Sequence, residues 1–292
     1  MSALPPEIIG GLADVADRYD AVLCDVWGVI HNGQVSFPET NAALIRYQQA
    51  RGPVVLISNS PRPSRAVLSQ MHALGVPDEA WSTFVTSGDV TRAELAARAP
   101  GPAWVIGAER DLVLYEGLHL AFAGPQDAAF VSCTGFPDDE VETPEDYRDR
   151  LAIAAGRDIP LICANPDRVV QRGAKMIPCA GAVADLYETL GGRVVMAGKP
   201  YAPIYTQALA DAEQLLGRPL DRRRVLAIGD GLPTDVLGAQ GMGLDCLFVT
   251  GGIHANETQT PDGRPDPERI ARFLGGHGAV VRYAVAELHW GG

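Results

Sequence analysis

Short apolar runs that end in turn residues recur along the whole chain. They occupy 21–29, 53–60, 82–88, 103–108, 128–133, 159–166, 193–198, 223–231 and 245–252. The runs are rich in β-branched residues and mostly continuous rather than alternating, which is typical of parallel strands buried on both faces. We therefore predict a β-strand in each of them.

Stretches with helical spacing of apolar residues lie between these runs. In 39–52 the apolar positions recur at helical spacing, and Gly52 follows as a stop signal. In 64–75, Ser64 is a candidate N-cap and Gly75 a candidate C-terminal glycine, and 206–217 repeats the pattern. Alternation of strands and helices predicts an α/β fold with a doubly wound parallel sheet.

The residues that indicate chemistry are concentrated near the two ends of the chain, in 21–62 and 196–252. The middle has its own strands and helices but fewer such residues. We therefore predict a Rossmann-like core domain formed by 1–88 and 194–292, with a second α/β domain inserted at 89–193. A length of 292 residues suits two domains.

Charge and composition exclude several classes of function. The formal net charge is −12, so we expect neither nucleic acid nor an anionic membrane as a partner. No run of about 18 apolar residues occurs, and no basic segment followed by an apolar one precedes residue 30, so we expect no membrane span and no signal peptide. The five cysteines contain no CxxC pair, which favours buried thiols in a reducing, cytoplasmic setting.

Three polar signals follow apolar strands. Asp25 ends the strand predicted in the first run, Ser58 and Asn59 follow the apolar part of the second, and Lys199 stands between a glycine and a proline after 193–198. Ligands bind at the carboxyl ends of strands in open α/β sheets, where hydroxyl and N–H groups hold phosphate oxygens. Each signal also has an ordinary explanation: a turn-forming aspartate, a polar loop before a helix, and a solvated lysine.

The fourth signal is the acidic pair Asp230 and Asp235, which straddles a predicted strand-to-helix turn. Two carboxylates placed in this way suit Mg²⁺, which prefers hard oxygen ligands. The alternative is a turn residue followed by an aspartate that interacts with the helix dipole. The pair alone does not decide between these interpretations.

Together, a strand-end carboxylate, a hydroxyl, a lysine and an acidic pair in this order resemble the motifs of the haloacid-dehalogenase-like hydrolases. The resemblance covers most of the chain and is greatest to the class IIA branch, which contains sugar-phosphate, nitrophenyl-phosphate and pyridoxal-phosphate phosphatases. In that branch a cap domain lies between the second and third motifs. Ala164-Asn165-Pro166-Asp167 is similar to a motif of that cap.

The resemblance implies a role for each matched residue. Asp25 would be the nucleophile that forms an aspartyl-phosphate, and Ser58, Asn59 and Lys199 would hold the phosphoryl oxygens. Mg²⁺ would be bound by Asp25, Asp230 and the backbone carbonyl of Trp27, with Asp235 orienting the metal shell. In the cap, Asn165 and Asp167 are candidates for contacts with the substrate.

One position departs from the pattern of this family. Its phosphatases carry a second aspartate two residues after the nucleophile, which protonates the leaving oxygen, and this chain has Trp27 there. An indole cannot transfer a proton in that way. His31 is a candidate substitute if the loop folds back, although we favour the alternative that it is a flap residue facing solvent.

We therefore expect a magnesium-dependent phosphatase acting on a small phosphorylated metabolite of the sugar or nucleotide phosphate class. The alternatives are a phosphometabolite-binding protein with little or no activity, and a hydrolase of acyl phosphates, whose leaving group needs no proton. An oxidoreductase fits poorly, because the glycines at 238, 241 and 243 lack the G-x-G-x-x-G spacing. The oligomeric state stays open, with a homodimer as one candidate.

Overall fold

The computed structural model describes residues 5–172 and 175–291, which form two compact units. The first unit contains the chain up to Ser58, Ser69–Val85 and the chain from Tyr205 onward. The second unit contains Asn59–Leu68 and Thr86–Ile204. Because the second unit extends beyond 89–193 on both sides, the domain boundaries expected from the sequence stay a prediction.

The first unit is built on a seven-stranded sheet with the order β1-β13-β12-β11-β2-β3-β4. Its strands are β1 (Glu7–Ile8), β2 (Ala21–Asp25), β3 (Val54–Ser58), β4 (Thr83–Thr86), β11 (Val225–Gly229), β12 (Asp245–Val249) and β13 (Tyr283–Val285). β2 pairs in parallel with both β3 and β11, and β11 pairs in parallel with β12. Both β2 and β11 are buried along their whole length, as expected of continuous apolar runs.

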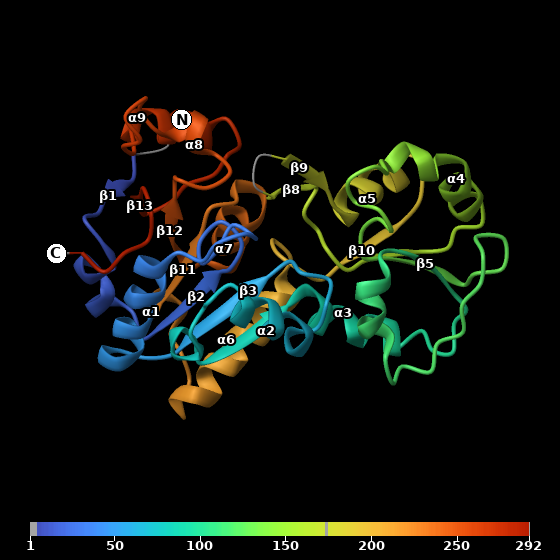
Figure 1. Ribbon diagram of the computed structural model, residues 1–292, viewed down its shortest axis with the longest axis horizontal. Coiled ribbons are helices and arrows are strands. Elements are labelled where there is room, and N and C mark those ends of the chain that lie inside the picture. The colour runs from blue at the N-terminus through green and yellow to red at the C-terminus, as the bar shows by residue number, and fades with distance from the viewer. Residues whose placement is uncertain (1–4, 173–174, 292) are drawn as a thin grey trace. The chain divides into compact units, whose positions relative to one another are not determined.

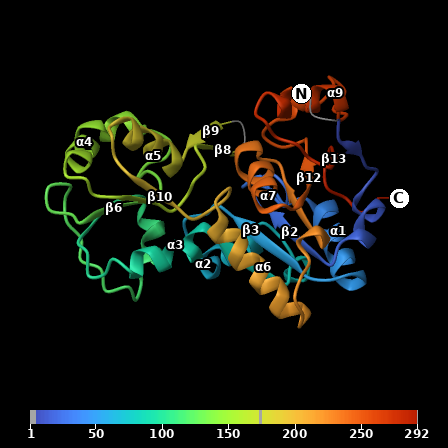
Figure 2. The same ribbon diagram turned by 180° about the vertical axis from the view of Figure 1, so that it is seen from behind.

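Helices cover both faces of this sheet. They are α1 (Pro38–Ala50), α2 (Ser64–Ala73), α6 (Ala202–Leu216), α7 (Leu237–Met242), α8 (Ala255–Thr258) and α9 (Pro267–Gly275). Short turns of other helix types are η1 (Leu12–Asp14), η2 (Ala16–Arg18), η3 (Asp78–Ala80), η6 (Arg222–Arg224) and the π-helical η7 (Leu232–Val236). One face shows α1 in front of the sheet (Figure 1), and the view from behind shows α6 and α7 (Figure 2).

This arrangement follows from the handedness of parallel crossovers. The chain moves from β2 through α1 to β3 in one direction along the sheet, and from β11 through α7 to β12 in the opposite direction. Since such crossovers are right-handed, the two helices lie on opposite faces. The strand order therefore reverses between β2 and β11, and the carboxyl ends of these strands are where a doubly wound sheet binds its ligand.

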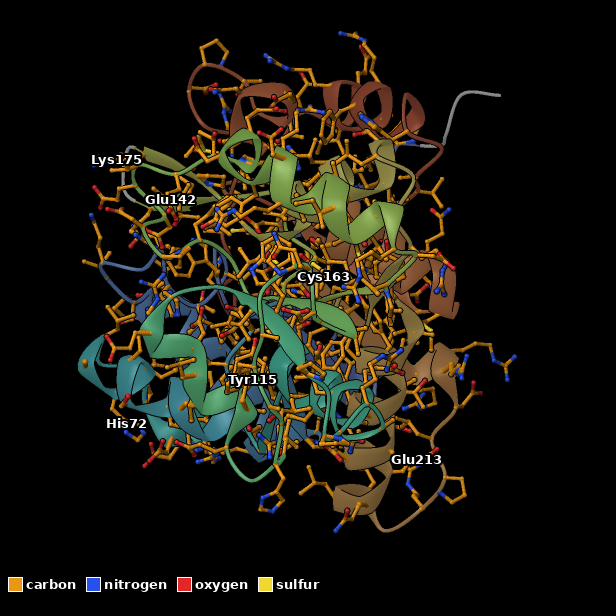
Figure 3. The ribbon with its side chains drawn as sticks, turned by 90° about the vertical axis from the view of Figure 1, so that its right-hand side faces the viewer. His72, Tyr115, Glu142, Cys163, Lys175 and Glu213 are labelled. Carbon is orange, nitrogen blue, oxygen red and sulfur yellow. The ribbon has the colours of Figure 1, made fainter. Side chains whose placement is uncertain are left out.

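The second unit has a parallel four-stranded sheet of order β10-β7-β6-β5 and an antiparallel pair, β8 and β9. Its strands are β5 (Ala103–Ile106), β6 (Phe130–Cys133), β7 (Leu161–Cys163), β8 (Val169–Arg172), β9 (Lys175–Pro178) and β10 (Val194–Met196). Its helices are α3 (Ser87–Ala96), α4 (Arg148–Gly156), α5 (Ala180–Thr189), η4 (Glu109–Tyr115) and η5 (Pro144–Tyr147). Cys163 and Tyr115 lie in its interior, whereas Lys175 is exposed (Figure 3).

The predicted α/β class and parallel central sheet are confirmed, and each of the nine apolar runs contains a strand. The three predicted helices are α1, α2 and α6. Gly75 has a left-handed backbone (φ +77°) just after α2, as expected of a C-terminal glycine. In the described part of the chain, every helix is too short or too polar to span a bilayer.

Candidate functional site

The carboxyl ends of β2 and β11 bring distant acidic residues together. Cys24 pairs with Ile228, so Asp25 and Asp230 both follow paired positions at the same edge of the sheet. Asp25, Asp230 and Asp235 are all buried, with exposed fractions of 6%, 7% and 3%. One carboxylate oxygen from each lies within 4.8 Å of the other two. The structure therefore brings these three acids together, and their role as metal ligands stays a prediction.

The donor set of this cluster fits Mg²⁺. Three carboxylates at this separation repel one another, and a divalent cation among them offsets that repulsion. All three donors are hard oxygens, and three protein ligands leave coordination positions for water and substrate. The backbone carbonyl of Trp27 stays a predicted further ligand.

Two glycines and one backbone amide fix the position of Asp230. A Cβ atom at Gly28 or at Gly252 would overlap the Asp230 carboxylate, so only glycine fits at these positions. Gly28 also has a left-handed backbone (φ +88°). The N–H of Ile253 donates to Asp230 Oδ2 at 3.0 Å. Asp230 is thus enclosed by backbone from two separate loops.

Asp235 is held by the turn that carries it. It lies in η7, where its Oδ2 accepts hydrogen bonds from Gly231 N at 3.1 Å and from Thr234 Oγ1 at 3.3 Å. A Cβ at Gly229 would overlap the Asp235 side chain. The predicted strand-to-helix turn is therefore present, but it is a π-helical turn, a form often found at functional sites.

The loop after Asp25 is closed by Trp27 and His31. Gly28 N donates to the His31 carbonyl at 2.8 Å, and the two rings meet edge to face with centroids 5.3 Å apart. Gly33 (φ +83°) packs against the indole so closely that a Cβ there would overlap it. Trp27 is half-buried and held on more than one side.

Our expectation that His31 faces solvent is wrong, because the loop folds back and leaves it only 2% exposed. Its Nδ1 accepts a hydrogen bond from Gly33 N at 3.1 Å. Burial lowers the pKa of His31 to about 4, so the ring is neutral at pH 7 and carries its proton on Nε2. The folding-back that could make His31 an acid is present, but the charged form that would donate is disfavoured.

Ser58 lies at the same sheet edge as the acid cluster. It is the last residue of β3, and the preceding residue, Ile57, pairs with Asp25. Ser58, whose hydroxyl is predicted to bind phosphate, therefore lies one residue beyond Ile57, the β3 residue that pairs with Asp25.

In the second unit, the Asn59 side chain bonds both to Lys199, a predicted phosphate ligand, and to Asp167 of the predicted cap motif. Asn59 Oδ1 accepts from Lys199 N at 2.7 Å, and its Nδ2 donates to the Lys199 carbonyl at 3.1 Å and to Asp167 Oδ1 at 2.8 Å. Asn165 Oδ1 in turn accepts from Asp167 N at 3.0 Å. Asn59 and Lys199 are 3% and 2% exposed. The Asn59 side chain therefore positions Lys199, a role that the sequence did not reveal.

The segment before Lys199 leaves no space for a side chain. A Cβ at Gly198 would lie 2.6 Å from both Asn59 Oδ1 and Ser87 Oγ. The expectation that flanking residues fix the lysine backbone is consistent with this packing. The predicted approach of the Lys199 ammonium to a phosphate at Asp25 stays a prediction.

Comparisons with known proteins agree with the motif order. A family model described as haloacid dehalogenase-like hydrolase matches 22–121, and a second, described as HAD-hydrolase-like, matches 196–273. A crystal structure of a haloacid dehalogenase-like hydrolase from Brucella suis is 46% identical and has a TM-score of 0.86, covering 96% of this chain and 100% of that one.

Two curated relatives are more distant. Chronophin from Rattus norvegicus is 28% identical over 258 residues, covering 84% of this chain and 81% of that protein. Ribonucleotide monophosphatase NagD from Escherichia coli is 27% identical over 236 residues, covering 80% of this chain and 88% of that protein. The resemblance and the fold class inferred from the sequence are confirmed by these matches.

Proposed function

Since this chain belongs to the haloacid dehalogenase-like hydrolases, we propose that it is a magnesium-dependent phosphatase acting on a small phosphorylated metabolite. The observation that carries the proposal is the cluster of Asp25, Asp230 and Asp235, buried where the strand order reverses. Of the three, Asp25 is the one that ends β2 itself, at the point where a bound ligand meets the sheet.

In the proposed reaction, a carboxylate oxygen of Asp25 attacks phosphorus in line with the leaving oxygen. The new oxygen–phosphorus bond forms as the bond to the leaving group breaks, giving an aspartyl-phosphate that water then hydrolyses. Ser58 and Lys199 hold the phosphoryl oxygens during both steps. When bound, Mg²⁺ would offset the repulsion between the anionic nucleophile and the anionic substrate.

Trp27 decides which substrates react well. The leaving oxygen of a sugar or alcohol phosphate needs a proton, and general acid catalysis contributes about 10²–10⁴-fold. Trp27 cannot supply that proton, and the low pKa of buried His31 makes it a poor replacement. We therefore propose that good leaving groups, such as acyl or aryl groups, react fastest within the general class of small phosphate esters and anhydrides.

The relatives support a small-molecule substrate. Their names include ribonucleotide monophosphatase, glycerol-3-phosphate phosphatase and D-glycerol 3-phosphate phosphatase. We propose a metabolite of the sugar or nucleotide phosphate class, with Asn165 and Asp167 contributing to its recognition from the second unit. The net charge of −12 argues against a nucleic acid or membrane partner, and the five buried thiols support a cytoplasmic location. A homodimer stays a candidate assembly.

The absence of the usual acid favours one second candidate, a phosphometabolite-binding protein that has lost turnover. The two functions are separated by measuring hydrolysis of acetyl phosphate, p-nitrophenyl phosphate and glycerol phosphate with and without Mg²⁺. The matched control is Asp25→Asn, which is nearly isosteric but cannot attack phosphorus. We expect metal-dependent turnover of the activated substrates that this variant abolishes. Mg²⁺-dependent binding of phosphate without turnover of any substrate would support the binding protein instead.

A further inference from the structure

The loop that follows β12 contacts the beginning of the acidic turn, at Asp230 and at Leu232. Ile253 N donates to Asp230 Oδ2 at 3.0 Å. The next residue, His254, accepts a hydrogen bond through Nε2 from Leu232 N at 3.3 Å. Two consecutive residues of one loop therefore fix the beginning of the turn that carries Asp235.

Leu232 N is a donor that needs a partner from outside its own helix. Leu232 is the first residue of η7, and the first N–H groups of a helix have no acceptor within it. The residue is only 3% exposed, so water has little access to it. A buried N–H without a partner is costly, and the His254 ring supplies the acceptor.

The His254 ring is held in place from its other side. Its centroid lies 4.8 Å from that of Phe273 in α9, and the Phe273 ring also packs edge to face against His277 at 5.4 Å. The His254 carbonyl accepts from Thr258 Oγ1 at 2.7 Å, which ties the loop to α8. The two helices lie side by side (Figure 1). The acceptor nitrogen therefore belongs to a ring that is packed against Phe273.

Charged groups near His254 shift its pKa in opposite directions. Burial, the largest effect, lowers the pKa of His254; Glu257 raises it and His277 lowers it. A neutral ring is the form that can accept a hydrogen bond through Nε2, with its proton on Nδ1. The electrostatic surroundings agree with the geometry.

We propose that His254 is a positioning residue for the metal-binding turn: by accepting the Leu232 N–H it sets the start of η7, and thereby the distance between the Asp230 and Asp235 carboxylates. This inference rests on the proposed magnesium site. Residues that orient metal ligands from outside the ligand set typically contribute about 10–100-fold to metal affinity. We expect loss of the acceptor to weaken Mg²⁺ binding by at least about tenfold.

Three substitutions separate the acceptor from the ring. His254→Phe keeps an aromatic ring against Phe273 and removes the acceptor. His254→Gln keeps an acceptor oxygen at similar reach and removes the ring. His254→Met has a length similar to that of glutamine and provides neither a ring nor a strong acceptor. Comparing glutamine with methionine isolates the hydrogen bond even if the phenylalanine variant fails to fold.

The experiment measures the dissociation constant for Mg²⁺ by calorimetry on the full chain without substrate, together with the thermal midpoint in EDTA. We expect weaker Mg²⁺ binding in the phenylalanine and methionine variants and near-normal binding in the glutamine variant. The thermal midpoint in EDTA should follow a different order, with phenylalanine nearest to wild type because it keeps the ring packing.

Two results overturn the inference while leaving the proposed function intact. One is normal Mg²⁺ affinity in both His254→Phe and His254→Met. The other is equal weakening in His254→Gln and His254→Met, which would mean that ring packing matters and the hydrogen bond does not. If the wild-type chain itself binds no Mg²⁺, the proposed metal site fails, and the inference fails with it.

Discussion

Replacing Trp27 with aspartate tests whether the missing acid limits this enzyme. Without a carboxyl group at position 27, the candidate acid in this loop is His31, whose pKa is about 4. Roughly one His31 ring in a thousand is then protonated at pH 7, as follows from three units between pH and pKa. The wild-type chain should therefore hydrolyse poor leaving groups slowly.

We expect Trp27→Asp to raise kcat/KM for alkyl phosphates by about 10²–10⁴-fold, the usual contribution of a general acid. For p-nitrophenyl phosphate or acetyl phosphate the gain should be small, because these groups leave without a proton. The smaller side chain gives up contacts with His31 and Gly33, so part of the gain can be lost to a looser loop. Trp27→Asn is the matched control, since it has the same size as aspartate and no acid.

The assay is kcat/KM across a series of phosphate esters ordered by leaving-group pKa, for the wild type, both Trp27 variants and His31→Ala. The reasoning would be supported if kcat/KM depends steeply on leaving-group pKa in the wild type and this dependence becomes shallow only in Trp27→Asp. Wild-type rates that do not depend on leaving-group pKa, and that do not fall in His31→Ala, would refute it. Equal gains in kcat/KM in Trp27→Asp and Trp27→Asn would show that the smaller side chain causes the gain, and not proton donation by a carboxyl group.

Three further predictions concern stability and positioning. Burial lowers the pKa of His31 to about 4 in the folded chain, against 6.5 normally. Between these two pH values the unfolded chain binds more protons than the folded chain, so the free energy of unfolding should fall by up to about 3 kcal/mol as the pH drops from 6.5 to 4. Urea unfolding should show a smaller fall in His31→Phe. Asn59→Ala leaves the Lys199 N–H without its acceptor and should raise KM by about tenfold, whereas unchanged kinetics would remove its positioning role. Gly252→Ala should abolish Mg²⁺ binding measured by calorimetry, because the new Cβ overlaps Asp230, while Gly241→Ala, which has open space around it, should bind Mg²⁺ normally.

The strands were predictable because each depends on a pattern within a few residues, whereas the grouping of Asp25, Asp230 and Asp235 was an expectation from the resemblance to the family. Continuous apolar runs marked the buried strands, and a carboxylate after such a run marked the functional edge. Two strands outside the predicted runs carry less pattern: β1 has two residues, and β8 alternates between exposed and partly buried positions. Such segments become strands only because a neighbouring strand is present to pair with them.

The supporting residues of the site were not predictable, for a different reason. Ile253 acts through its backbone N–H, which every residue except proline possesses, so its identity carries no signal. Asn59 stays a predicted phosphate ligand, and the bond of its amide to a segment 140 residues away in the sequence has no local signal. His31 was expected to be exposed because nothing local indicates that Gly33 and Trp27 close the loop over it.

The contacts that support the acids indicate how position 27 can differ without disturbing the proposed metal site. Asp230 is held by the bare Cα atoms of Gly28 and Gly252 and by the Ile253 N–H, and none of these contacts involves the side chain at position 27. Two hydrogen bonds to Asp235 come from groups within its own turn. Since Trp27 packs against His31 and Gly33, we expect a substitution there to leave these contacts of Asp230 and Asp235 in place. We therefore expect that the supply of protons can change in this chain without loss of the proposed metal site.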